Sequence, residues 1–185
     1  VRIREEIVHT LPYCNLLHFR RSGEYQHPKL LIIAPMSGHY ATLLRGTVEQ
    51  FIPDHEVYIT DWVNAREVPL EEGSFSFDDY VRYLIEFLQL LGPDTHVIGV
   101  CQPSVPAIVA TTVMAEQNDP CAPKSLILMG GPIDTRVNPT EVNDYASGKD
   151  YEWFQNNKGF IIYRTFKRSW FFICNPFIIL LIICY

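Results

Sequence analysis

Short apolar runs, separated by segments with helical spacing, constrain the fold of this chain more than any other feature. The four clearest runs are Lys29–Ala34, Glu56–Thr60, Thr95–Val100 and Ser125–Met129. Short apolar runs without polar alternation are typical of strands that are buried on both faces of a parallel sheet. The chain is therefore expected to bring these four segments together in the interior of one sheet.

Helices are predicted between these strands. Phe77–Leu91 has the strongest pattern, with acidic residues at its start, an apolar stripe at helical spacing, and Gly92-Pro93 as its stop signal. Ala41–Phe51 and Ser104–Gln117 are the other two predicted helices. Prolines stand at the start of the last one, where a missing N–H is tolerated.

Two further strands, Arg2–Thr10 and Asn15–Arg20, are predicted ahead of the first apolar run, joined by a proline-containing turn. From there, strands and helices alternate, which predicts an α/β fold with a mainly parallel sheet and right-handed crossovers. Active sites in such folds form at the carboxyl ends of the strands. The informative loops are those that follow Ala34, Thr60, Val100 and Met129.

Bulk properties exclude several classes of function. The 185 residues suffice for one core, and a formal net charge of −6 argues against a nucleic-acid partner, which a basic face would bind. Five cysteines at scattered positions show no metal-ligand spacing, so no metal site is expected. An odd, scattered set of cysteines fits a reducing cytosol better than a disulfide framework. The first ten residues contain no apolar signal core.

One cysteine stands where a strand is predicted to turn into a helix. The sequence Gly99-Val100-Cys101-Gln102-Pro103 resembles the nucleophile elbow G-x-S-x-G, in which small residues two positions either side permit a sharp turn. The first glycine is present, and proline replaces the second. Cys101 is therefore a candidate nucleophile.

There is a chemical reason for a nucleophilic cysteine to stand at the start of a helix. The positive end of a helix dipole stabilises a thiolate, and the backbone N–H of Gln102 is a candidate donor to an oxyanion. The loop after Ala34 would supply the second backbone donor. Pro35 has no N–H, so Met36 and Ser37 are the two candidates. Gly38 would let this loop approach a reacting carbonyl closely.

Two alternative interpretations of this segment are open. Cys101 could be a small buried hydrophobic residue at a strand end, which is the commoner role of a free cysteine. The coincidence of strand, glycine, cysteine, helix and a glycine-containing loop favours the nucleophile instead. Ser104 is a rival nucleophile, but it lies one turn into the predicted helix and is better explained as a first-turn residue.

Three long blocks of the sequence resemble one known family. They are "LLIIAPMSGHYATLLRGTVEQFIPDHEVYITDWVNAREVPL", "DTHVIGVCQPSVPAIVA" and "LMGGPIDTRVNPTEVN". They are similar to the intracellular polyhydroxyalkanoate (polyhydroxybutyrate) depolymerases, which are α/β-hydrolase-fold esterases with a cysteine nucleophile. The resemblance runs to about Asn157, and the segment VCQPS gives Cys101 the family's nucleophile role.

The resemblance implies a function. Cys101 would attack the ester carbonyl of a (R)-3-hydroxyalkanoate, a histidine would take its proton, an aspartate would orient that histidine, and water would hydrolyse the acyl-thioester. No cofactor is implied. The implied partner is a stored polyester granule or a 3-hydroxyalkanoate oligomer, and the implied location is the cytoplasm, at the granule surface.

The chain departs from the family after the nucleophile. The acid and the histidine of this fold follow the nucleophile in the chain, and the resemblance implies that both lie well beyond residue 157. All six histidines here precede Cys101, so the triad histidine and acid of the family are expected to be absent. His39, in the loop beside the predicted oxyanion site, and Asp134, after the last strand, are the only candidates near the site. Each also has a purely structural interpretation: His39 could shape its loop, and Asp134 could be a turn residue. His96 is excluded because it opens its strand at the opposite end of the sheet.

Composition divides the chain in two. Residues 1–157 are expected to form the amino-terminal part of an α/β-hydrolase domain, truncated before the last strands and the cap, and little or no esterase activity is expected of it. Residues 158–185 form an apolar tail without acidic residues, interrupted by Asn175-Pro176, which resembles out-of-frame translation. Its almost wholly apolar part, Trp170–Tyr185, is shorter than the ~20 residues that a transmembrane helix needs.

Two alternative functions are also considered. A polyhydroxyalkanoate synthase-like acyltransferase also uses an elbow cysteine, although Pro103 weighs against it, because the usual synthase form keeps glycine there. The second alternative is a non-catalytic module that associates with granules or membranes through the apolar tail.

Overall fold

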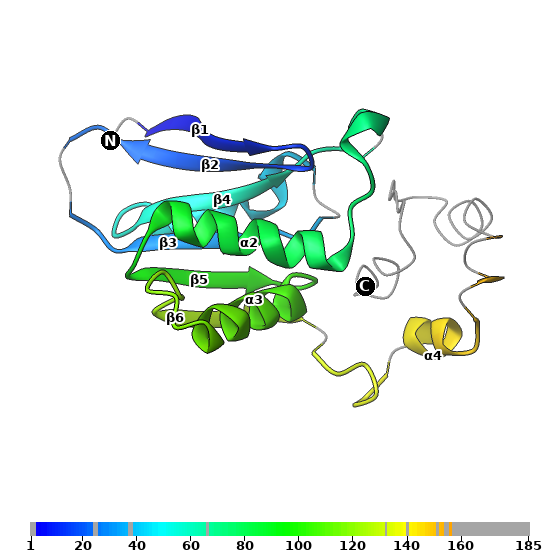
Figure 1. Ribbon diagram of the computed structural model, residues 1–185. Helices are drawn as coiled ribbons and strands as arrows, with labels where there is room; N and C mark the ends of the chain where they lie inside the picture. Colours follow the sequence, from blue (N-terminus) through cyan, green and yellow to red (C-terminus); the bar gives the residue numbers. More distant parts are fainter. Residues whose placement is uncertain are drawn as a thin grey trace.

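A computed structural model describes residues 3–23, 26–36, 39–65, 67–131, 133–139, 141–150, 152, 153 and 156. The strands are β1 (Ile3–Leu11), β2 (Cys14–Arg21), β3 (Lys29–Ile33), β4 (Glu56–Trp62), β5 (Thr95–Val100) and β6 (Ser125–Met129). The α-helices are α1 (Arg45–Phe51), α2 (Phe77–Leu91), α3 (Ser104–Glu116) and α4 (Glu141–Ser147), with 3₁₀ turns η1 (His39–Leu44) and η2 (Leu70–Glu72) (Figure 1).

The described strands form one sheet in the order β1-β2-β4-β3-β5-β6. β1 and β2 are an antiparallel hairpin, and β2 pairs antiparallel with β4. β4, β3, β5 and β6 are all parallel to one another. The carboxyl ends of β3, β5 and β6 therefore lie along one edge of the sheet, where Met36, Cys101 and Gly130 follow their strands.

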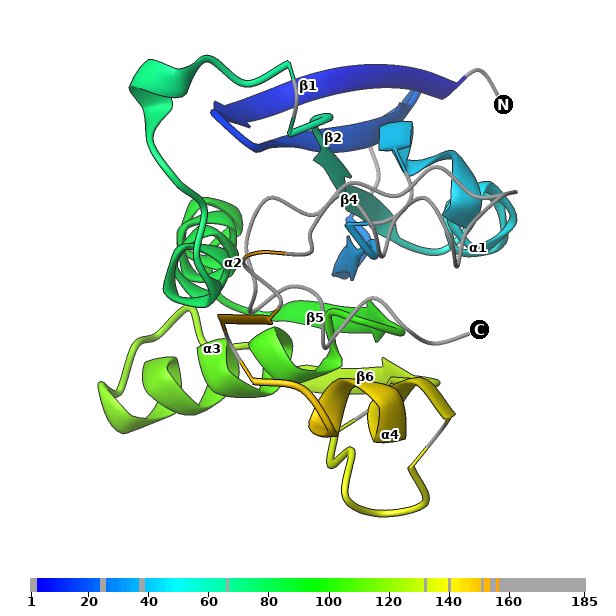
Figure 2. The ribbon, with the colours of Figure 1, turned by 90° about the vertical axis from the view of Figure 1, so that its right-hand side faces the viewer.

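Helices cover both faces of the sheet. α2 and α3 pack side by side on one face, and α1 lies on the other (Figure 2). The parallel strands are consequently buried, and β3 is apolar and enclosed from Leu30 to Ile33. A single core joins the strands to the inner faces of the helices, and its largest fully buried side chains include Trp62, Tyr80, Phe87 and Leu84.

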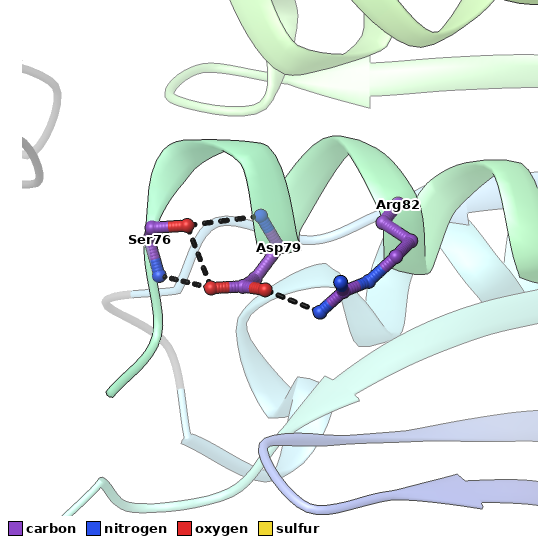
Figure 3. A network of polar contacts seen from close by, with 3 residues as sticks. All are labelled: Ser76, Asp79 and Arg82. Carbon is purple, nitrogen blue, oxygen red and sulfur yellow. Dashed lines mark hydrogen bonds and ion pairs between the residues drawn. The ribbon is translucent and has the colours of Figure 1, made fainter. Parts of the chain in front are cut away.

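α2 is helical for reasons that are visible in its sequence. Ser76 and Asp79 form a capping box at its start, with Arg82 paired to the same carboxylate one turn on (Figure 3). Its apolar stripe, including Tyr80, Leu84 and Phe87, is buried against the sheet. Gly92 ends it at a φ of 79°, a conformation that glycine adopts without strain.

The predicted fold class is confirmed, and the strands and α2 occupy the predicted segments. The predicted helix at Ala41–Phe51 begins instead as the 3₁₀ turn η1 and becomes α-helical only from Arg45. α4 was not predicted, because its polar sequence EVNDYAS has no apolar stripe.

The expectation for the apolar tail, residues 158–185, concerns residues outside the described part. Among the described helices, none has the length and apolar character needed to cross a membrane.

Candidate active site

The junction between β5 and α3 is a tight, strained turn at Cys101. Cys101 has a φ of 66°, in the left-handed region that residues with a side chain rarely adopt. Two hydrogen bonds hold the turn: Cys101 N–H donates to the Met129 carbonyl at 2.7 Å, and Ser104 N–H donates to the Cys101 carbonyl at 3.1 Å. The side chain is half-buried at the carboxyl end of β5. A single strained residue between a buried strand and a helix is the geometry of a nucleophile elbow.

Ser104, the rival nucleophile, is fully buried in the first turn of α3. Its hydroxyl donates to the Cys101 carbonyl at 2.8 Å, so it braces the elbow from inside. A Cβ placed on Gly131 would lie 1.8 Å from Ser104 Oγ and 2.4 Å from the Cys101 carbonyl oxygen. The loop after β6 therefore packs directly on the elbow and requires a glycine there.

Gln102, the residue after the elbow cysteine, is 2 % exposed. Its side-chain Oε1 accepts a hydrogen bond from Met36 N–H at 2.9 Å, which joins the loop after β3 to the elbow. Within the described residues, neither its backbone N–H nor its buried Nε2 has an acceptor. The Gln102 backbone N–H, immediately beside Cys101, is thus a donor without an acceptor in the described part of the chain.

Side chains of β4 fix the loop after β3 from the other side. Thr60 Oγ1 accepts from Ala34 N–H at 2.9 Å, and Trp62 Nε1 donates to the Ala34 carbonyl at 2.8 Å. Both side chains are buried, and the Trp62 ring packs edge-on to Tyr80 with centroids 4.6 Å apart. Sequence reasoning did not identify Thr60 or Trp62, although both stand at the carboxyl end of a buried strand, which is where such anchors occur.

The remaining predicted site residues are placed as follows. Ser37 lies outside the described residues, and so does the side chain of His39, whose backbone opens η1. Asp134 binds Arg136: its carboxylate accepts from Arg136 Nε at 2.9 Å, from Nη2 at 2.8 Å and from the backbone N–H at 3.0 Å. These contacts lower the pKa of Asp134 to about 2 and commit the carboxylate to its own turn.

His96 is the second residue of β5, whereas Cys101 follows the last one. At a rise of about 3.3 Å per residue, their backbones are roughly 16 Å apart along the strand. His96 Nδ1 lies 2.7 Å from Ser125 Oγ at the amino-terminal end of the sheet. This position confirms that His96 is remote from the elbow. Among the described residues, no group of three or more His, Cys, Asp or Glu side chains is arranged to hold a metal ion.

The sequence matches no family model and no curated protein. Solved structures share the fold at low identity. N-formylmaleamic acid deformylase from Pseudomonas putida S16 is 19% identical with a TM-score of 0.51, over 73% of this chain and 50% of that one. The thioesterase domain from the curacin biosynthetic pathway is 16% identical with a TM-score of 0.52, over 80% and 50%. Carboxylesterase CesB from Bacillus subtilis is 11% identical with a TM-score of 0.50, over 80% and 50%.

These similarities establish the α/β-hydrolase fold, and the chain spans about half the length of the solved structures that it matches.

Proposed function

We propose that this chain is the nucleophile-bearing part of a cysteine esterase of the polyhydroxyalkanoate depolymerase type. The observation that supports this most directly is the left-handed backbone of Cys101 between β5 and α3. Strain of this kind persists where the surrounding structure holds it, and it is concentrated at functional sites. The solved structures of the same fold include enzymes that are named as an esterase and a thioesterase.

The proposed chemistry begins with the Cys101 thiolate. Its sulfur attacks the carbonyl carbon of a 3-hydroxyalkanoate ester, and negative charge develops on the carbonyl oxygen. The tetrahedral intermediate collapses when the C–O bond to the leaving alcohol breaks, which leaves an acyl-thioester on Cys101. A proton from water passes to the departing alkoxide. A water molecule then attacks the acyl carbon, the Sγ–C bond breaks, and the hydroxy acid and the Cys101 thiol are released.

Backbone donors would stabilise the developing charge. The Gln102 N–H is the first, because it follows the nucleophile and has no acceptor among the described residues. The second would come from Met36 or Ser37. Met36 N–H is already donated to Gln102 Oε1, which favours Ser37 as the second donor.

The proposal includes a limit on turnover. All six histidines precede Cys101 in the sequence, whereas this fold draws its base from a histidine that follows the nucleophile. We therefore expect these 185 residues to form the acyl-thioester with an activated ester but to release it slowly. The implied partner remains a polyester granule or 3-hydroxyalkanoate oligomer in the cytoplasm.

The test is acylation by the p-nitrophenyl ester of (R)-3-hydroxybutyrate, followed by intact mass and peptide mapping. We expect one acyl group on Cys101 and none in a Cys101→Ala variant. Cys121→Ala is the matched control, because Cys121 is the other half-buried cysteine among the described residues, and this variant should be acylated like the parent. Acylation at Cys121, or a Cys101 that iodoacetamide alkylates but the ester does not acylate, would remove the nucleophile assignment.

A further inference from the structure

The Gln102 side chain connects two loops that are far apart in the sequence. Oε1 of Gln102 accepts from Met36 N–H at 2.9 Å, across 66 positions of the chain. Met36 follows β3 and Gln102 follows β5, and these strands are parallel neighbours. The bond therefore joins the elbow to the adjacent loop at the same edge of the sheet.

Burial makes this bond significant. Gln102 is 2 % exposed, and its Nε2 has no hydrogen-bond partner within the described part of the chain. An amide that is buried with half its hydrogen bonds unmade is unfavourable compared with an apolar side chain of the same shape. Stability alone does not explain a glutamine here, whereas a need to hold the Met36 peptide in one orientation does.

The orientation of the amide follows from its partner. Met36 N–H is a donor, so the oxygen of the carboxamide must face it and the nitrogen must face away. With Ala34 held by Thr60 and Trp62 on the β4 side, Gln102 supplies the attachment on the β5 side. The peptide groups after Ala34 are thereby fixed between two neighbouring strands.

We propose that the Gln102 carboxamide is a positioning group of the oxyanion site: by accepting from Met36 N–H it fixes the Met36 peptide group, and Ser37, the proposed second donor, is the next residue in the chain. The inference rests on the proposed function, because it assigns Gln102 a role in acyl transfer to Cys101. Gln102 thus contributes twice, once through its backbone N–H as a donor and once through its side chain as the support of the opposite loop.

Two reactions of the same thiolate separate this role from general reactivity. In acylation, the Sγ–C bond forms at an ester carbonyl, p-nitrophenolate leaves, and the carbonyl oxygen becomes an oxyanion in between. In alkylation by iodoacetamide, the Sγ–C bond forms as the C–I bond breaks and iodide leaves, without an oxyanion. The ratio of the two rates cancels the fraction of thiolate, so it responds to a change in the oxyanion site even when the reactivity of the thiol changes.

The test compares this ratio in the parent protein and in Gln102→Met. This variant keeps the size of the side chain but removes the acceptor, and we expect it to lower the ratio about tenfold, less than the ~10²-fold loss of a donor itself. Gln102→Glu keeps an acceptor for Met36 N–H and is used as the comparison in hydrogen exchange only, because the charge of a carboxylate would itself act on the developing oxyanion. Gln117→Met, at an exposed position, is the control for the glutamine-to-methionine change.

Each outcome is decisive. A parental ratio in Gln102→Met would overturn the proposal, and so would hydrogen exchange of Met36 N–H that is equally fast in Gln102→Met and Gln102→Glu. Faster hydrogen exchange of Met36 N–H in Gln102→Met than in Gln102→Glu would support it independently of any reaction. Failure of the proposed function would look different, since the parent protein would then show no acylation of Cys101.

Discussion

The two long helices on one face of the sheet begin in opposite ways. At α2, Ser76 Oγ accepts from Asp79 N–H at 3.2 Å, and the Asp79 carboxylate accepts from Ser76 N–H at 2.7 Å (Figure 3). At α3, the N-cap position is Pro103, which makes no side-chain hydrogen bond to the first turn. The start of α2 is closed by its own side chains, and that of α3 is left without such a cap.

This difference separates stability from chemistry. A helix start leaves backbone donors that need partners, and side-chain caps are the usual supply. Beside the uncapped start of α3 stand the strained Cys101 and the Gln102 N–H, which has no acceptor among the described residues. The start of α3 thus leaves a backbone donor open, which the proposed function assigns to the developing oxyanion, while the start of α2 is closed by the Asp79 carboxylate of its own first turn.

The largest expected effect concerns the loop that supports the start of α3. In Gly131→Ala, the new Cβ would meet Ser104 Oγ and the Cys101 carbonyl at distances below any real contact. We expect the free energy of unfolding in urea to fall by about 3 kcal/mol, because the elbow and the loop cannot both keep their positions.

The matched control is Gly46→Ala in α1, where an added Cβ meets nothing within 4 Å. Because alanine favours a helix more than glycine does, Gly46→Ala should raise the free energy of unfolding slightly, by less than about 1 kcal/mol. Equal effects at both glycines would mean that the loop after β6 does not pack against the elbow.

At the closed helix, Ser76→Ala removes the hydroxyl of the capping box. We expect the free energy of unfolding to fall by about 1 kcal/mol, because Asp79 N–H loses its acceptor. Urea denaturation measures it, with Ser147→Ala at the end of α4 as the control, since that serine is not at an N-cap. A loss at Ser147 as large as that at Ser76 would show that the cap is not the cause.

The capping box of α2 and the uncapped α3 also show how far the sequence determines this molecule. The strands and the two long helices were predictable, because apolar runs, stop signals and acidic starts are local. The position of Cys101 was predictable too, since a strand, a glycine and a helix flank it within a few residues. Its positive φ confirms the geometry expected of an elbow.

The support of the site was not predictable. Gln102 reaches Met36 across 66 positions, and Thr60 and Trp62 reach Ala34 across 26 and 28. The sequence lists these polar side chains but does not say which backbone group each one meets, since that depends on strand register. Asp134 and Arg136 are only two residues apart, yet their interaction was not predictable either, because the sequence permits other turn geometries equally well.

A smaller effect of opposite sign is expected at the elbow. Cys101→Gly removes the strain of a φ of 66°, so we expect the free energy of unfolding to rise by about 0.5 kcal/mol, the left-handed cost being partly offset by the flexibility of glycine in the unfolded chain. Asn118→Gly, at a φ of 54°, is the control with a smaller expected gain, because asparagine tolerates this region. A stability loss in Cys101→Gly would contradict stored strain at Cys101.

The smallest effect concerns pH and returns to the closed helix. The pKa of Asp79 lies below its ordinary value of 3.8, chiefly because the Ser76 hydroxyl donates to its carboxylate, with further support from Ser76 N–H and Arg82. Since the folded pKa is lower than the unfolded one, the charged carboxylate contributes stability above pH 3.8, and this contribution disappears as the pH falls through the folded value.

Asp79→Asn should therefore lower the free energy of unfolding by about 0.3 kcal/mol near pH 7 and progressively less below about pH 4, where the parent becomes protonated as well. Urea denaturation of both proteins at several pH values gives this difference directly. Asp78→Asn, whose carboxylate lies in the same turn outside the capping box, should show a smaller difference at every pH. If the Asp79 difference stayed constant down to pH 3, the carboxylate would not be stabilised by the cap, and the contrast between the two helix starts would rest on α3 alone.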